Sequence, residues 1–161
     1  MQFDKFSLKG TSWLKPGNFK ICDEEGELAY SVTSNAWKFK KEFKLLSKHN
    51  DIVYHISSNS SLSVSFNLYE QDRLIAQINK PLSWSNQLIE IETEISDPFI
   101  VKGNIWGNEY KFIRDETDFA IVSYKIWSSG VLGVAIKKGE LIPLILAVVI
   151  IIAHLKQSGM A

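Results

Sequence analysis

Most of the chain alternates apolar and polar residues in short runs. Between residues 61 and 68 the apolar side chains fall on alternate positions, and serines and one asparagine occupy the positions between them. Ile89 and Ile91 alternate in the same way with Glu90 and Glu92. Successive side chains of a strand point to opposite faces, so this pattern predicts antiparallel strands with one face against a core and the other in water.

Turn signals separate these runs. Residues 23–26, Asp-Glu-Glu-Gly, lie between two apolar runs and end in a glycine, which tolerates the positive φ of a hairpin turn. Similar breaks fall at 70–72, 103–107, 115–118 and 128–130. The intervening runs predict about twelve strands. They are expected near Phe6, Phe19, Leu28, Phe43, Ile52, Leu62, Leu74, Leu88, Phe99, Tyr110, Ala120 and Val131.

The pattern changes at residue 141, where thirteen consecutive residues carry neither a charge nor a hydroxyl group. Pro143 suits the first turn of a helix, and Glu140 suits its positive end. His154 and Lys156 suit the opposite end. We therefore predict a helix over about 140–155. A helix without a polar face is surrounded by hydrocarbon on every side, either protein or lipid.

The length of the predicted helix favours burial inside the protein over insertion in a lipid bilayer. Thirteen helical residues reach about 20 Å, whereas the hydrocarbon core of a bilayer is roughly 30 Å thick. Twelve tilted strands make a barrel wall roughly 12 Å from its axis, close to the distance at which a helix packs against a sheet. The predicted fold is all-β with one helix: an antiparallel barrel of about twelve strands that encloses a buried hydrophobic C-terminal helix. We expect one domain over residues 1–161.

Composition narrows the function classes. Eighteen basic and eighteen acidic residues give a formal net charge of zero, so no overall field attracts nucleic acid, and none is expected as a partner. Cys22 is the single cysteine, which excludes an internal disulfide, and we expect a small buried apolar residue there. The first ten residues lack the apolar run of a secretory signal, so a cytoplasmic location is expected. The lipid-binding candidate described below adds the expectation of a peripheral position at the membrane.

No pattern typical of an enzyme is present. The chain contains no glycine-rich phosphate loop, no Gly-x-Ser-x-Gly and no His-Glu-x-x-His. His49, His55 and His154 lie on separate segments without ligands at metal-binding spacing, so we expect neither a metal nor another cofactor. Glu90, Glu92 and Glu94 share one face of a predicted strand and are interpreted as a solvated face.

The strongest binding candidate is a stretch of lysines interleaved with aromatic residues. Such a stretch is typical of attachment to an anionic lipid surface. The alternative is a strand pair in which Phe39, Phe43 and Leu45 point inward while the lysines keep an edge soluble. Stacking of single-stranded nucleic acid on Trp37 or Phe39 is a weaker hypothesis. The candidate lipid-binding residues are Trp37, Lys38, Lys40, Lys41, Lys44 and Lys48.

Three further tryptophans lie beside predicted turns. Trp84, Trp106 and Trp127 either line a ligand cleft or cap an end of the barrel, and we favour the cap.

Several segments, taken in order, resemble the tubby C-terminal-like superfamily, and within it the LURP-one-related group. They are FKICDEEGELAYSV at 19–32, LIAQINK at 74–80, IVKGNIWGNEY at 100–110, AIVSYK at 120–125 and the apolar segment from 141. The resemblance implies a twelve-stranded barrel threaded by a C-terminal helix. Related domains include the phosphoinositide-binding tubby proteins and, more distantly, the phospholipid scramblases. The resemblance thus implies an association with membrane lipid.

These observations lead to a non-catalytic binding module that associates with membrane phospholipid or with a protein partner. Two alternatives remain open. One is a tail-anchored membrane protein with 141–155 as the anchor, and the other is a carrier of small hydrophobic ligands. The carrier is disfavoured because the predicted helix would fill its cavity.

Truncation after Glu140 distinguishes the hypothesis of a helix buried in the barrel from that of a membrane anchor. A chain that needs the helix as its core will not fold without it, whereas an anchored domain will become a soluble folded protein. Circular dichroism and size-exclusion chromatography of the truncated chain measure the difference.

Overall fold

The computed structural model describes residues 2–9, 18–34, 42–80, 88–104, 109–127 and 131–157. Twelve strands and one helix fall within these ranges. The elements are β1 (Phe3–Lys9), β2 (Asn18–Cys22), β3 (Leu28–Ser34), β4 (Glu42–Ser47), β5 (Ile52–Ser58), β6 (Ser65–Glu70), β7 (Arg73–Asn79), β8 (Leu88–Thr93), β9 (Phe99–Asn104), β10 (Glu109–Arg114), β11 (Thr117–Ser123), β12 (Leu132–Lys137) and α1 (Ile142–Gln157).

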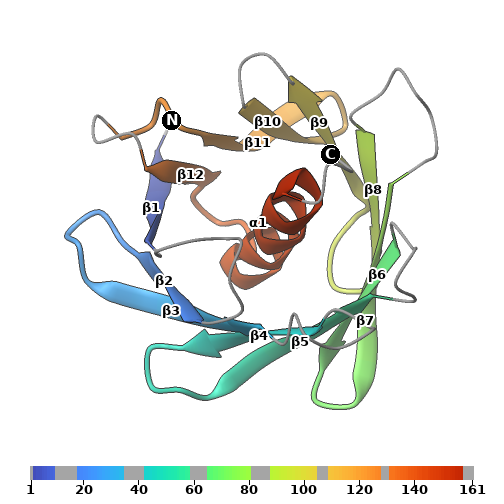
Figure 1. Ribbon diagram of the computed structural model, residues 1–161. Coiled ribbons are helices and arrows are strands. Elements are labelled where there is room, and N and C mark those ends of the chain that lie inside the picture. Colours follow the sequence, from blue (N-terminus) through green and yellow to red (C-terminus); the bar gives the residue numbers. More distant parts are fainter. Residues whose placement is uncertain are drawn as a thin grey trace.

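The strands form one closed antiparallel barrel in which each pairs with its neighbours in sequence (Figure 1). Pairing of β1 with β12 closes the barrel, with Phe3 opposite Lys137 and Leu8 opposite Leu132. The predicted fold class is confirmed. The strand expected near Leu62 corresponds to β6, described over Ser65–Glu70, and Leu62 itself lies outside the described residues. Helix α1 lies two residues later than expected.

Helix α1 runs through the interior of the barrel (Figure 1). Every side chain over 144–153 is at most 7% exposed. All twelve strands, from β1 to β12, contribute buried inward side chains to the same core cluster. Because α1 is enclosed by its own barrel, the tail-anchor alternative is wrong. Among the described residues, no helix combines the length and apolarity needed to cross a bilayer.

Aromatic side chains pack near both ends of α1. Phe99, Phe112 and Phe119 form a cluster in which neighbouring ring centroids lie 5.2–6.0 Å apart. Near the end of the helix, the His154 ring meets Phe43 and Phe66 edge to face at 5.4 and 6.0 Å. His154 is thus a helix-end histidine packed on aromatic rings, as the sequence analysis expected.

The barrel has two chemically different ends. Short turns join β2 to β3, β4 to β5, β6 to β7, β8 to β9 and β10 to β11, and the turn after β12 leads into α1. Because neighbouring strands are antiparallel, these turns lie together at what we call the entry end, where α1 begins. The odd-numbered strands finish at the opposite end, the exit end, where α1 also finishes.

The buried helix provides the first stability test. Leu146 is fully buried, so Leu146→Ala removes apolar contacts and leaves a cavity, and we expect the free energy of unfolding to fall by about 2–5 kcal/mol. Leu141 is 42% exposed, so the same substitution there is expected to cost less than about 1 kcal/mol. Urea denaturation followed by circular dichroism measures both. Equal losses would contradict a core built around α1.

Candidate functional site

The structure places only part of the predicted lipid-binding stretch. Trp37, Lys38, Lys40 and Lys41 lie outside the described residues. Lys44 is exposed on the outer face of β4, and Lys48 is exposed in the turn after it. Four residues of extended chain span about 13 Å. The structure therefore does not bring Lys44 and Lys48 into one cluster, and Lys48 belongs to the entry end.

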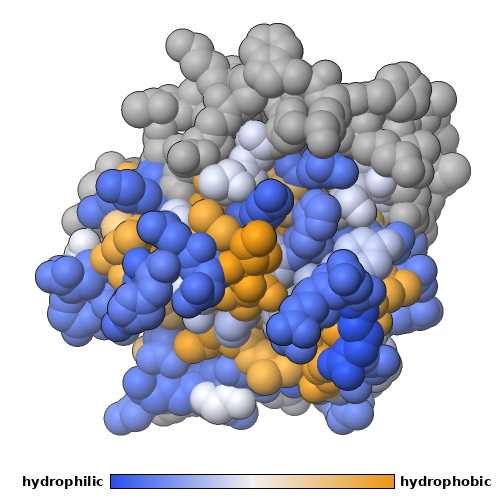
Figure 2. Space-filling model, turned by 90° about the horizontal axis from the view of Figure 1, so that it is seen from below, coloured by the Kyte–Doolittle hydropathy of each residue, from blue (hydrophilic) through white to orange (hydrophobic). Residues whose placement is uncertain are grey.

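The outer wall around β4–β7 mixes polar residues with a small apolar area. Lys44 lies opposite His55, and His55 lies opposite Tyr69. Ile52 and Leu74 are 59% and 40% exposed. Figure 2 shows hydrophobic residues at the centre of this wall between groups of hydrophilic ones.

Acidic residues dominate the turns of the entry end. Eleven carboxylates occur in these six turns, against two lysines and His49. The acidic residues are Asp23, Glu24, Glu25, Glu27, Asp51, Asp72, Glu94, Asp97, Asp115, Glu116 and Glu140. Negative charge near the start of a helix is favourable because the helix dipole is positive there. The entry end is thus acidic in a chain whose net charge is zero.

The sequence around the exit end has the opposite character. Six segments follow the odd-numbered strands in the chain: 10–17, 35–41, 59–64, 80–87, 105–108 and 124–131. In sequence they contain six lysines, all five tryptophans and neither Asp nor Glu. Of these residues the structure describes 80, 124–127 and 131. Among them, Lys125 is exposed, Tyr124 is 40% exposed, and burial lowers the pKa of Lys80.

Trp127 is held on the barrel wall. Its Nε1 donates a hydrogen bond of 2.9 Å to the carbonyl oxygen of Phe6 on β1. A Cβ atom at Gly133 of β12 would lie 2.6 Å from the Trp127 ring, so only glycine leaves room for the indole. Trp127 therefore packs over β1 and β12, the strand pair that closes the barrel, rather than lining a cleft. Trp84 and Trp106 lie outside the described residues.

An ion pair ties the start of α1 to the wall. Arg114 Nη1 lies 3.1 and 3.0 Å from the two carboxylate oxygens of Glu140. The two side chains are 19% and 22% exposed. The guanidinium carbon of Arg114 also lies 4.2 Å from the centroid of the Phe119 ring, a cation–π contact. Arg114 therefore joins the turn before α1 to the aromatic cluster inside the barrel.

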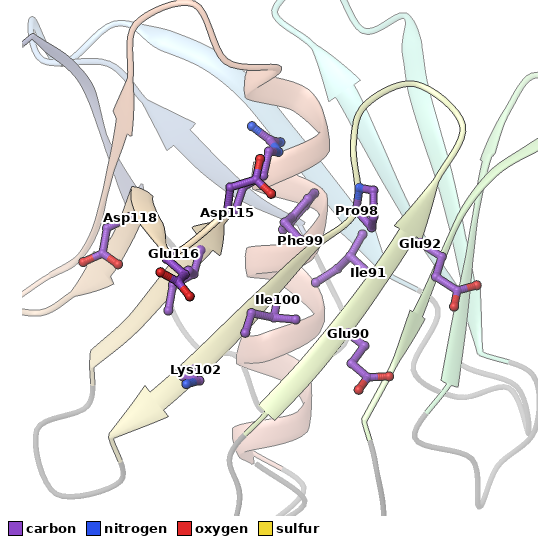
Figure 3. A pocket seen from close by; sticks show the side chains of 12 residues that line it. Glu90, Ile91, Glu92, Pro98, Phe99, Ile100, Lys102, Asp115, Glu116 and Asp118 are labelled. Atoms are coloured by element: carbon purple, nitrogen blue, oxygen red, sulfur yellow. The ribbon is translucent and has the colours of Figure 1, made fainter.

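A groove of about 640 Å³ lies on the outer surface across β8–β11 (Figure 3). Strand register places Glu90 opposite Ile100, Ile100 opposite Ile113, and Ile113 opposite Asp118. Two isoleucines thus form a floor between two carboxylates. The complete lining is Glu90, Ile91, Glu92, Pro98, Phe99, Ile100, Lys102, Ile113, Arg114, Asp115, Glu116 and Asp118.

The sequence analysis missed this groove. Glu90 and Glu92 were interpreted as a solvated face, and both are exposed on β8. Glu94 is also exposed and lies 3.2 Å from Arg73. The alternation of Glu with Ile was the available signal. It does not reveal which residues of the neighbouring strands stand beside these glutamates.

Three tyrosines and the single cysteine are buried or half-buried in the barrel. Burial raises the pKa values of Tyr30, Tyr54 and Tyr110, and the charge of Glu70 adds to the rise at Tyr54. Cys22 is buried and free, as predicted. Across the described ranges, no three His, Cys, Asp or Glu side chains gather as a metal site.

Comparison with known proteins adds a family and a fold. The profile described as LURP-one-related matches residues 5–153. The X-ray structure of an Arabidopsis thaliana protein, AT5G01750, is similar with a TM-score of 0.66 and 16% sequence identity, over 93% of this chain and 89% of that chain. No curated protein matches the sequence. At this identity the structural likeness concerns the fold alone.

The Arg114–Glu140 pair generates the second stability test. Glu140→Gln leaves a largely buried guanidinium without its anionic partner, and we expect the free energy of unfolding to fall by about 1–2 kcal/mol. Glu94→Gln is the matched control, because the Glu94–Arg73 pair is 53% and 64% exposed and is worth about 0.5 kcal/mol. Urea denaturation of both variants provides the comparison. A loss at position 94 as large as that at 140 would contradict a special role for the pair.

Proposed function

The chain belongs to the LURP-one-related family of the tubby C-terminal-like superfamily, and we propose that it is a non-catalytic binding module that associates with anionic phospholipid through the exit end of its barrel. In this proposal the protein is cytoplasmic and peripheral at the membrane. The observation that carries it is a charge asymmetry in the sequence: the turns of the entry end contain eleven carboxylates, whereas the segments that follow the odd-numbered strands contain six lysines and no acidic residue.

The filled interior supports a role on the outer surface. Helix α1 occupies the space that a carrier of the lipocalin type would use for its ligand, and residues 144–153 are buried by the surrounding strands. A carrier of small hydrophobic ligands would therefore have no interior cavity in which to bind its ligand. A partner of this barrel must be recognised by outward side chains or by the segments that link the strands.

Charge and aromatic content favour the exit end as the surface that meets lipid. Each lysine near an anionic membrane contributes about 1 kcal/mol, and tryptophan favours the interface between headgroups and hydrocarbon. The segments that follow the odd-numbered strands combine six lysines with five tryptophans and no acidic residue. The acidic entry end is repelled by the same surface, so the two ends together orient the molecule.

Vesicle sedimentation tests the proposal. Wild-type protein is expected to sediment with vesicles that contain phosphatidylserine but not with phosphatidylcholine alone, and added salt is expected to release it. The combined variant Lys38→Gln, Lys40→Gln and Lys41→Gln should bind at least about tenfold more weakly, because three lysines near the surface are lost.

The matched control removes three lysines from the other half of the barrel. Lys5→Gln, Lys48→Gln and Lys137→Gln change the net charge equally, and all three residues lie toward the entry end. This variant should bind like wild type. Equal weakening of both variants would show a general charge effect and refute the assignment to the exit end. Equal binding to neutral and anionic vesicles would refute the lipid proposal.

A further inference from the structure

We propose that the groove across β8–β11 binds an extended segment of another protein that carries basic side chains on both sides of an apolar one. This inference is independent of the lipid proposal, because the groove lies on the side wall and extends to the turns of the entry end. The occupant is assigned from the shape, charge and spacing of the lining residues.

The floor of the groove is apolar and belongs to rigid strands. Ile100 of β9 and Ile113 of β10 stand opposite each other on the outer face of the barrel, and both are half-buried. Pro98 continues the apolar lining toward the entry end. An outward pair of isoleucines in a depression offers contact to one apolar side chain of a partner.

The rim of the groove is acidic on both sides. Five carboxylates line it against two basic side chains, and one of these, Arg114, is already paired with Glu140. Glu90 and Glu92 form no ion pair among the described residues. Asp118 lies 3.9 Å from Lys111, a long contact between exposed groups. The rim therefore holds carboxylates that are available to a cationic partner.

The turn at the end of the groove is conformationally unusual. Asp115 and Glu116 have φ values of 50° and 64°, the left-handed region that two-residue hairpin turns require and that Asn-Gly fills most readily. Asp115 is a residue type that tolerates this conformation, whereas Glu116 occupies the position where glycine is preferred. The turn thus holds two carboxylates beside the groove at the expense of local stability.

Strand spacing fixes the spacing expected in the partner. Glu90 and Asp118 are separated by three inter-strand distances, which is about 14 Å. An extended chain rises about 3.4 Å per residue, so side chains four residues apart on one face are separated by about the same length. The matching segment has basic residues at positions i and i+4 and an apolar residue at i+2, above the two isoleucines.

Fluorescence anisotropy with a labelled peptide tests this inference. The probe is Gly-Lys-Ser-Leu-Ser-Lys-Gly, titrated with the full-length protein at low salt. Saturable binding is expected, and replacing the leucine of the peptide with serine should weaken it about five- to tenfold. Absence of saturable binding, or equal binding of the serine peptide, would overturn the proposal.

Variants of the protein locate the peptide. Glu90→Gln and Asp118→Asn should each weaken binding about two- to fivefold, the effect of one exposed ion pair. Glu24→Gln with Glu25→Gln removes two carboxylates from a turn outside the groove and should leave binding unchanged. Equal weakening by the combined Glu90→Gln, Asp118→Asn variant and by the Glu24→Gln, Glu25→Gln variant would show attraction to the acidic surface in general and would overturn the assignment to the groove.

The variant Glu116→Gly is expected to change peptide binding and the stability of the protein in opposite directions. Glycine adopts a φ of 64° without strain, so this variant should raise the urea midpoint while it weakens peptide binding. Unchanged peptide affinity would contradict a role of Glu116 in the groove.

Sedimentation velocity identifies a competing occupant. The wild type should remain in the same oligomeric state as the Glu90→Gln, Asp118→Asn variant at all concentrations. A concentration-dependent association that only the wild type shows would mean that a second copy of the chain fills the groove, and it would overturn the assignment to another protein.

Discussion

The packing of one apolar helix inside a closed barrel determines the rest of this structure. A helix without a polar face needs an apolar surface on every side, and the twelve strands supply it with their inward side chains. Because the helix fills the barrel, the interior offers no space for a ligand. What remains accessible is the outer surface, and the described turns of the entry end are rich in carboxylates.

Most of this architecture follows from local patterns in the sequence. The uncharged run over 141–153 is too short for a bilayer, and its length matches that of the surrounding strands. Alternation such as that of Ile89 and Ile91 with Glu90 and Glu92 identifies the strands correctly. The alternation that begins at Leu62 likewise leads into β6, whose described pairing with β7 includes Ser65 opposite Asn79.

The candidate sites were harder to predict because they depend on which strands become neighbours. Glu90 and Asp118 are 28 positions apart in the chain, and only the register of four strands places two isoleucines between them. In the other direction, Lys44 and Lys48 are close in sequence but separated along the barrel axis. The role predicted for the lysine stretch stays a prediction, because Trp37, Lys38, Lys40 and Lys41 lie outside the described residues.

Closure of the barrel has a consequence for its biosynthesis. β1 finds its second neighbour in β12, so the edge of the first strand stays open while the intervening chain leaves the ribosome. β12, the strand that closes the barrel, is followed directly in the chain by α1, the helix that fills the interior. Nascent chains therefore pass through a stage with both an unpaired edge and an unfilled interior, which is the stage at which a chaperone has the most surface to shield.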